Sequence, residues 1–305
     1  MHPRASAAIK SAFYGSGLYT RRLRSVQFPG LAVLCYHGLR AGPPRGTPFE
    51  PLQVAVETFE RHCRLIRDSC DPIGADMLLA ALDGGAPLPA RAVLVTFDDG
   101  YRTVLTLAKP VLERYGIPAV VFVCSDPIAR GRLLWYDAVA RTRGEAEVER
   151  LKTVPFSEWR DTVHPFDIPA AEGDPYAPLT VDELRRLADG HGIEIGGHTL
   201  RHAILSHATA DEQAGQIADD KRTIEEWTGR PARFFSYPNG RPRIDYTLAT
   251  CDVVERCGYL AAFTTQTAYA RASSDRYELP RFLMLDSMTA PALAHRLTFG
   301  WVAAH

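Results

Sequence analysis

The chain has 305 residues, of which 46% are hydrophobic and 23% are charged, and its formal net charge at pH 7 is -1. This composition is that of an ordinary soluble globular protein with enough apolar residues for a core, which argues against a disordered chain. The near-neutral charge gives no overall attraction to nucleic acid. No stretch reaches the roughly 20 apolar residues needed to span a bilayer.

Residues 1–30 form a basic segment, because no Asp or Glu precedes Glu50. A signal peptide needs a continuous apolar region, which Lys10, Gly15 and Gly17 interrupt. We therefore expect a partly disordered basic arm on a cytoplasmic protein, since the glycines would break an amphipathic helix. The alternative is a peripheral contact with anionic lipid at the inner membrane. It would use the apolar residues Ile9, Phe13, Leu18 and Tyr19 beside the arginine cluster of Arg21, Arg22 and Arg24.

The cysteines also favour a cytoplasmic protein. Six cysteines are scattered along the chain without a CxxC pair. In a chain of this size they are expected to be reduced, buried thiols and not a disulfide framework. Cys251 and Cys257 are close enough in sequence to leave one pairing open.

From residue 31 onward, short apolar runs alternate with segments of helical periodicity. Residues 31–36 and 92–95 are too short for helices and are predicted to be strands buried on both faces. The apolar residues of 104–112 share one face of a helix, and another apolar strand follows at 119–123. Strand, helix and strand at this spacing form a βαβ unit, so the sheet is predicted to be parallel.

The pattern loosens between residues 126 and 178, which we interpret as an insertion because the segment is too short for its own core. A capping box formed by Thr180 and Glu183 then starts the next helix. Seven predicted strands alternate with helices, which predicts an α/β fold, either a (β/α) barrel or an open doubly wound sheet. One domain over 31–300 is the better prediction. The remaining strands are predicted at 193–195, 234–237, 260–264 and 282–285.

Three predicted strands end in reactive residues, and strand ends are where α/β folds place their sites. The first carries Asp98 and Asp99, which can divide metal binding and proton transfer, or can merely form an Asx turn. The second is followed by His198 and His202, which share one face if the segment is a helical turn, as a metal pair requires. A structural pair is the alternative. The third runs into the turn at 237–240, which either offers an N–H to an oxyanion or is only a turn.

Together these motifs resemble a known family. The sequence reads TFDDG at 96–100, HTxxH at 198–202 and YPxG at 237–240. In order and spacing they are similar to the motifs of polysaccharide deacetylases, the NodB-homology group or carbohydrate esterase family 4. The resemblance covers about residues 31–285. It implies a distorted (β/α)7 barrel and metal-dependent hydrolysis of an N-acetyl group, in some members an O-acetyl group, on a sugar.

The same resemblance implies roles for individual residues. Asp99, His198 and His202 would hold one divalent ion, for which we expect Zn²⁺, and Asp98 would be the general base. One carboxylate and two imidazoles leave open positions on such an ion, as hydrolysis needs. The family pairs its base with an arginine, and Arg281 stands at the matching place, where it would lower the pKa of Asp98. The alternative for Arg281 is a surface arginine after a proline.

The chain departs from the family pattern at the residue that protonates the leaving amine. Many members carry a late histidine after a short apolar strand, but residues 282–286 contain none. We therefore predict that His37, at the end of the first strand, is the general acid, with a structural histidine as the alternative. His207 and His295 are weaker candidates. The backbone N–H near Asn239 is the expected oxyanion donor.

An acetylated sugar or glycan is thus the predicted partner, and aromatic residues are its expected contacts. We predict substrate contacts from Tyr101, Trp135 and Tyr237. Trp135 and Tyr136, with Asp137, are candidates for part of the sugar platform, and packing inside the insertion is the equal alternative. Two rival functions stay open. One is a barrel that has lost catalysis and only binds glycan or lipid-linked sugar, and the other is a hydrolase of a non-sugar amide.

Overall fold

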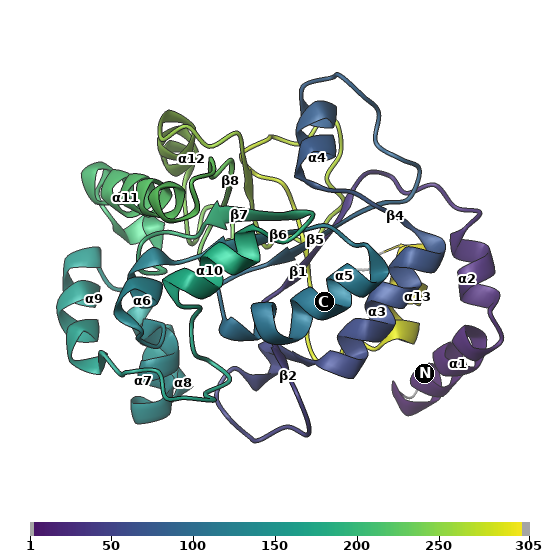
Figure 1. Ribbon diagram of the computed structural model, residues 1–305, viewed down its shortest axis with the longest axis horizontal. Coiled ribbons are helices and arrows are strands. Elements are labelled where there is room, and N and C mark those ends of the chain that lie inside the picture. The colour runs from purple at the N-terminus through teal and green to yellow at the C-terminus, as the bar shows by residue number, and fades with distance from the viewer. Residues whose placement is uncertain (1–2, 301–305) are drawn as a thin grey trace.

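A parallel sheet forms the centre of the computed structural model, which describes residues 3–300 and their side chains from residue 8 onward. The strand order is β10-β1-β5-β6-β7-β8-β9, with β4 paired to β5. The sheet is curled, and helices lie around it (Figure 1). A parallel bridge joins Phe263 of β9 to Leu279, shortly before β10. The predicted α/β fold, a distorted (β/α)7 barrel, is confirmed.

All seven predicted strands are present, with small shifts at their ends, and three short strands were not predicted. The strands are β1 (Ala32–Tyr36), β2 (Gly38–Arg40), β3 (Gln53–Ala55), β4 (Asp71–Pro72), β5 (Ala92–Phe97), β6 (Ala119–Val123), β7 (Ile193–Gly197), β8 (Phe234–Ser236), β9 (Ala261–Phe263) and β10 (Phe282–Leu283). The helices are α1 (Pro3–Gly15), α2 (Leu18–Leu23), α3 (Val56–Ser69), α4 (Ala75–Leu82), α5 (Lys109–Tyr115), α6 (Ser125–Arg130), α7 (Trp135–Arg143), α8 (Glu145–Leu151), α9 (Phe156–Val163), α10 (Val181–Ala188), α11 (Ala210–Thr228), α12 (Leu248–Arg256) and α13 (Ala290–Phe299). A π-helical turn (Val104–Ala108) precedes α5, and 3-10 turns span Glu50–Leu52, His164–Phe166 and Leu205–His207.

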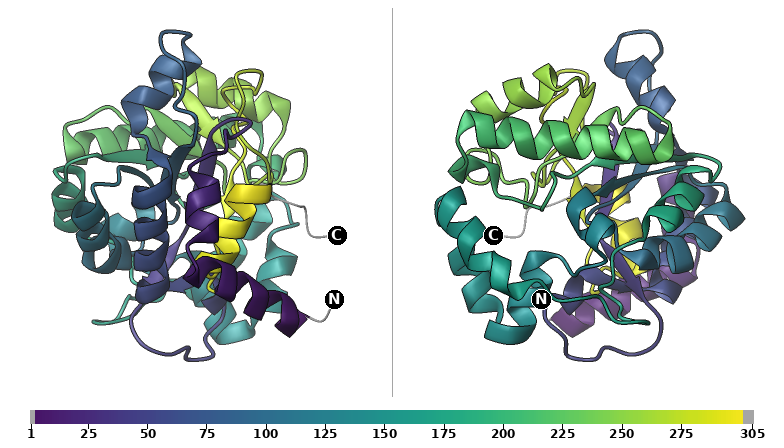
Figure 2. Two further views of the ribbon diagram at one scale, coloured as in Figure 1. Left: turned by 90° about the vertical axis from the view of Figure 1, so that its right-hand side faces the viewer. Right: turned by 60° about the vertical axis from the view of Figure 1, so that its left-hand side comes forward.

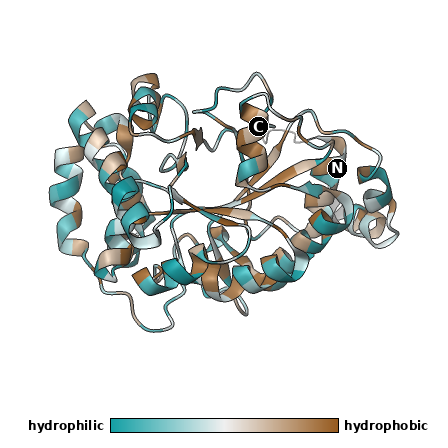
Figure 3. Ribbon diagram, turned by 45° about the horizontal axis from the view of Figure 1, so that its top comes forward, coloured by the Kyte–Doolittle hydropathy of each residue, from teal (hydrophilic) through white to brown (hydrophobic). Residues whose placement is uncertain are grey.

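The side-chain alternation of β5 explains how the sheet positions the site. Val93 and Val95 pack with the surrounding helices, whereas Leu94 packs with apolar side chains of the neighbouring strands inside the barrel. Both faces are buried, so the strand is apolar except for Thr96, and the central strands in Figure 3 are correspondingly brown. Because side chains alternate along a strand, Thr96 and then Asp98 continue the interior row.

The N-terminal segment is helical, where the sequence predicted a partly disordered arm. Gly17, whose φ is 75°, separates α1 from α2 and takes a backbone conformation that is strained for other residues. Both helices contact α13, and α2 also contacts α3. Figure 2 shows the purple N-terminal helices beside the yellow α13. Tyr19 and Leu23 are buried at this contact, so the glycines divide the segment into two helices that tertiary packing then holds.

The predicted insertion at 126–178 contains α7 to α9 and all of α6 except its first residue, on the left of the sheet in Figure 1. Their apolar side chains cluster around Trp135 and Trp159, and Cys124 and Ala203 of the barrel belong to the same cluster. The insertion therefore packs as an extension of the barrel.

Two further expectations concern the cysteines and the membrane. All six cysteines are free thiols, so Cys251 and Cys257 are not paired. Within residues 3–300, no helix is both long and apolar enough to cross a membrane.

The stability of the fold is expected to depend on pH through His62, which α3 buries completely. The Tyr36 hydroxyl lies 3.0 Å from its Nδ1, and burial lowers the pKa of His62 from 6.5 to about 4. Between these values the unfolded chain binds a proton that the native chain does not, so stability falls as the pH falls from 6.5 towards 4. At about 1.4 kcal/mol per pKa unit, the full loss is about 3 kcal/mol.

Urea unfolding of the wild type and of His62→Gln, at neutral pH and at about pH 4.5, tests this dependence. His62→Gln is expected to lose less stability over the interval, because its side chain does not titrate. His191→Gln, which removes an exposed histidine, should respond to pH as the wild type does. An equal response in His62→Gln and the wild type would contradict the prediction.

Candidate active site

The paired carboxylates lie where β5 ends and the chain turns sharply. Asp98 still takes part in the hydrogen bonding between β5 and β1, because its N–H donates to the Tyr36 carbonyl oxygen over 2.9 Å. At Asp99 and Gly100 the φ angles become positive, 74° and 73°. A Cβ at position 100 would also lie only 3.0 Å from a methyl group of Val123, so this turn requires glycine. The turn points the two carboxylates in different directions, and each meets a different set of partners.

Asp99, His198 and His202 converge on one point. Asp99 Oδ1 lies 3.4 Å from His198 Nε2 and 3.5 Å from His202 Nε2, and all three side chains are buried. His198 Nδ1 lies 2.6 Å from the Ser236 carbonyl oxygen. A carbonyl oxygen can only accept, so Nδ1 carries a proton, and in its neutral form the ring has its Nε2 lone pair on the side of Asp99.

These donor atoms fit a divalent metal ion. Among the described residues, Asp99 Oδ1 has no hydrogen-bond partner although it is buried, an arrangement that is costly unless a cation satisfies it. Two atoms held about 2.1 Å from a tetrahedral ion lie about 3.4 Å apart, which agrees with the spacing found here. One carboxylate with two imidazoles is a donor set typical of catalytic zinc.

Protonation of the three groups follows from the same neighbours. Burial raises the pKa of Asp99, but attraction to His37, His198 and His202 outweighs it and leaves the pKa below its ordinary value. Burial lowers the pKa of His202 to about 3. For His198 burial acts in the same direction, yet the adjacent Asp99 carboxylate and the charge of Asp98 raise its pKa overall. The cluster therefore holds an ionised carboxylate and a neutral His202, the forms that bind a cation.

The two histidines are held by a loop and not by the helical turn considered from their spacing. Thr199 and His202 have positive φ angles, 65° and 56°. The loop is fixed from both ends: Asp220 accepts the His198 N–H over 3.0 Å, and the Trp135 indole donates to the His202 carbonyl oxygen over 3.0 Å. The HxxxH spacing thus brings the rings together through backbone geometry that the sequence does not reveal.

Asp220 of α11 was not predicted as part of the site. It is fully buried and also accepts the N–H and the hydroxyl of Ser125, over 2.9 Å and 2.6 Å. Burial raises its pKa to about 7. An acidic residue on the buried face of an amphipathic helix is the one signal by which the sequence could have indicated it.

Replacing Trp135 with phenylalanine is expected to weaken metal binding about tenfold, because the loop that carries His202 loses its indole donor. Titration of the metal-free protein with Zn²⁺ measures the change. Trp159→Phe is the matched control. Trp159 belongs to the same apolar cluster as Trp135, but its indole N–H has no hydrogen-bond partner among the described residues. Equal affinity in both variants would contradict a supporting role for Trp135.

Arg281 lies next to Asp98, as expected from the family resemblance, and its side chain is fully buried. Its two terminal nitrogens each lie 2.7 Å from a different carboxylate oxygen of Asp98. Its Nε donates to the Thr264 carbonyl oxygen over 2.9 Å, and Nη2 donates to the Ser236 hydroxyl over 2.8 Å. Burial raises the pKa of Asp98, but the Arg281 charge outweighs burial and lowers this pKa to about 2. Asp98 is therefore ionised and fixed in orientation, and the surface-arginine alternative is wrong.

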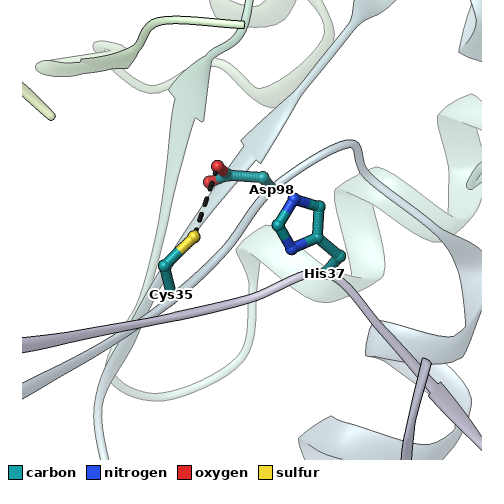
Figure 4. Close-up of side chains that lie close together, drawn as sticks. All are labelled: Cys35, His37 and Asp98. Atoms are coloured by element: carbon teal, nitrogen blue, oxygen red, sulfur yellow. Dashed lines mark hydrogen bonds between the residues drawn. The ribbon is translucent and has the colours of Figure 1, made fainter. Parts of the chain in front are cut away.

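His37 follows β1 and lies beside Asp98, as Figure 4 shows together with Cys35. Ligand atoms of these three residues lie within 4.8 Å of one another. The Cys35 thiol lies 3.5 Å from Asp98 Oδ2, and burial raises the pKa of Cys35 well above its ordinary value, so it stays protonated and donates. His37 Nδ1 is buried without a hydrogen-bond partner among the described residues, so no hydrogen bond at Nδ1 fixes the tautomer of the ring.

A cavity of about 320 Å³ opens over these residues. His37, Asp98, Asp99 and Asn239 line it, together with both histidines of the loop. Asn239 has a φ of 56°, and its carbonyl oxygen accepts from the Thr265 hydroxyl over 2.6 Å. Apart from Tyr136, sequence reasoning did not identify the outer walls, which come from residues 41–52, the insertion and the loop after β8. They include Phe49, Leu52, Tyr136, Glu149, Lys152 and Arg241.

The predicted substrate contacts do not reach this cavity. Tyr101 is buried, with its hydroxyl 2.8 Å from both the Asp137 carboxylate and the Tyr136 hydroxyl. Tyr237 is stacked on Tyr246 with ring centroids 3.8 Å apart, and its hydroxyl donates to a backbone carbonyl. Trp135 supports the metal loop, and the neighbouring Tyr136 lines the cavity instead.

The two weaker candidates for the acid also lie elsewhere. Neither His207 nor His295 lines the cavity. His207 is exposed, and His295 Nδ1 lies 2.9 Å from the Tyr19 hydroxyl beside the N-terminal helices. Apart from the two histidines of the metal cluster, His37 is therefore the histidine that lines the cavity.

Solved structures with the same architecture include two bacterial proteins. The deacetylase PplD of Streptococcus pyogenes, solved in complex with acetate, aligns with a TM-score of 0.66 and 19% identity over 88% of this chain and 98% of its own. IcaB from Ammonifex degensii aligns with a TM-score of 0.63 and 20% identity over 90% of this chain and 99% of its own. At these identities the likeness shows the fold alone.

Sequence comparison identifies the family. YxkH of Bacillus subtilis (strain 168), whose name places it among polysaccharide deacetylases, is 24% identical over 266 residues, which are 86% of this chain and 74% of YxkH. A stretch of 61 residues is 38% identical to the poly-β-1,6-N-acetyl-D-glucosamine N-deacetylase of Escherichia coli (strain K12), covering 20% of this chain and 9% of that protein. The family model described as polysaccharide deacetylase matches residues 85–262, more than half of the chain. The chain belongs to the polysaccharide deacetylase family.

Proposed function

We propose that this protein is a metal-dependent hydrolase that removes the N-acetyl group from an amino sugar within a glycan. The observation that carries the proposal is the convergence of Asp99, His198 and His202 beside a second carboxylate that Arg281 keeps ionised. The chemistry supplied by a divalent ion on the first three residues, for which we propose Zn²⁺, is polarisation of the acetyl carbonyl and acidification of a water molecule.

Asp98 is the proposed general base. It lines the cavity next to the metal cluster, and its two bonds to Arg281 hold the carboxylate in one orientation. Each carboxylate oxygen keeps a further lone pair after accepting from Arg281, so Asp98 can still accept a proton from the attacking water.

His37 and Asn239 complete the proposed machinery. His37 lies on the Asp98 side of the cavity and can donate a proton to the leaving amine. The Asn239 N–H has no hydrogen-bond acceptor among the described residues, and the residue lines the cavity. It is the proposed donor to the oxyanion that develops on the acetyl carbonyl.

The proposed substrate is a glycan that contains N-acetylglucosamine. Support comes from the E. coli relative, whose name states deacetylation of poly-β-1,6-N-acetyl-D-glucosamine. Tyr136, whose ring lines the cavity next to His202, offers an aromatic surface of the kind that packs against a pyranose ring.

Metal analysis combined with acetate release tests the proposal on wild type, His198→Ala and His207→Ala. β-1,6-linked N-acetylglucosamine oligomers, a generic acetyl ester and small cyclic amides are the substrates. We expect one bound divalent ion and metal-dependent acetate release in the wild type, both lost in His198→Ala. His207→Ala, which changes an exposed histidine outside the cavity, should retain both.

Other outcomes would overturn parts of the proposal. Turnover of cyclic amides without acetate release would show that the substrate is not an acetylated sugar. Bound metal without turnover of any substrate would indicate a barrel that binds glycan but has lost catalysis.

A further inference from the structure

An apolar hollow lies at the N-terminal helices, away from the catalytic cavity. Side chains of α1, α2 and α13 enclose about 510 Å³ there. Four of its apolar side chains are between 44% and 62% exposed, and they are half of the eight large hydrophobic side chains exposed in the described part of the chain. We call this hollow, together with the residues that line it, the N-terminal surface. Its exposed apolar residues are Ile9, Phe13, Leu18 and Phe299.

The fold holds these side chains outward. Tyr19 and Leu23 anchor α2 in the core, and the Tyr19 hydroxyl lies 2.9 Å from His295 Nδ1 of α13. The rings of Phe13 and Phe299 contact the Tyr19 ring edge-on, with centroids 6.0 Å and 6.2 Å away. The exposed apolar residues therefore belong to a packed three-helix arrangement and not to a frayed chain end.

The charge around the N-terminal surface is entirely basic along the first two helices. Lys10 and Arg22 line the hollow, and Arg21 is exposed on α2 beside them. Within residues 3–300 none of these three side chains has a carboxylate partner. The chain as a whole carries a net charge of only -1, so the basic character is a local property of this surface.

An apolar patch bordered by unpaired cations suits an anionic lipid surface. Apolar side chains enter the boundary between headgroups and acyl chains, while lysine and arginine contact lipid phosphates. A second copy of the chain fits less well, because a two-fold contact would place the same cations opposite one another. We propose that the N-terminal surface docks the protein on an anionic membrane, with Phe13 and Leu18 inserted and Lys10, Arg21 and Arg22 at the headgroups.

Sedimentation with lipid vesicles tests this proposal on the full chain. We expect binding to mixed phosphatidylcholine and phosphatidylglycerol vesicles, little binding to phosphatidylcholine alone, and weaker binding as salt is raised. The double variants Phe13→Asp/Leu18→Asp and Lys10→Glu/Arg22→Glu should each bind at least about tenfold more weakly. Met77→Asp is the matched control, because Met77 is 44% exposed on α4, outside the N-terminal surface.

No residue of the N-terminal surface lines the catalytic cavity, so acetate release from a soluble oligomer should be unchanged in all these variants. A circular dichroism spectrum like that of the wild type would show that each variant is folded. This check does not depend on finding the proposed activity. Failure of the wild type to bind anionic vesicles would overturn the inference. So would equal binding by Met77→Asp and Phe13→Asp/Leu18→Asp, or self-association in light scattering that the Phe13→Asp/Leu18→Asp change abolishes.

Discussion

Replacing Arg281 with methionine is expected to destabilise the fold by about 3–5 kcal/mol, because a buried carboxylate loses its charge partner. Asp98 and Arg281 are both buried, and two bonds of 2.7 Å join them. The Arg281 side chain is completely buried on the barrel side of Asp98, so water from the cavity does not take the place of the guanidinium, and Asp98 must either stay charged without its partner or take up a proton. Urea unfolding of the metal-free protein measures the loss without a contribution from bound metal.

A second substitution separates the broken pair from the lost packing. The double variant Arg281→Met/Asp98→Asn removes both charges, and it should recover a large part of the stability that Arg281→Met loses. Arg150→Met is the control, since Arg150 pairs with Glu147 on the exposed face of α8, and its unfolding midpoint should not change. If Arg281→Met unfolds at the wild-type midpoint, the ion pair does not stabilise the barrel.

The residues around Asp98 were predictable from sequence because their positions follow from strand ends. In a parallel sheet the carboxyl ends of the strands meet at one edge, so motifs after β5, β7 and β8 had to converge there. Side-chain alternation along β5 turns Asp98 inward. The sequence therefore indicated both the carboxylate pair and the two histidines before any contact was known.

Side-chain direction inside the insertion was not predictable in the same way. Trp135 and Tyr136 are adjacent on α7, and which of them faces the cavity depends on how that helix docks. Trp135 is directed at the loop carbonyl of His202, and Tyr136 reaches the cavity. The loop that carries the histidines likewise depends on positive φ at Thr199, which is uncommon for a residue other than glycine, asparagine or aspartate.

The N-terminal helices show how tertiary packing can override local propensity. Gly15 and Gly17 disfavour one continuous amphipathic helix, and the segment is indeed divided into α1 and α2 at Gly17. Contacts of α1 and α2 with α13 supply stabilisation that depends on residues far along the chain, such as His295, which lies 276 positions after Tyr19 and contacts it. Short-range patterns contain no information about such contacts.

The substitution Asp98→Asn is expected to lower kcat by about a hundredfold to ten-thousandfold while leaving the bound metal in place. The amide cannot accept a proton from water at neutral pH, but it keeps the shape of the carboxylate. Metal should remain because the three converging donors belong to Asp99, His198 and His202. Acetate release and metal content, measured on the same preparations, distinguish the two effects.

Asp286→Asn provides a control for simply neutralising a carboxylate paired with arginine. Asp286 lies 2.7 Å from Arg40 and does not line the cavity, so its variant should keep wild-type kcat. Loss of metal in Asp98→Asn would place Asp98 in the ligand set and leave the chain without its proposed base. Activity within tenfold of wild type would instead move proton transfer to another group of the cavity. His37, which lies beside Asp98 and outside the metal cluster, is the candidate.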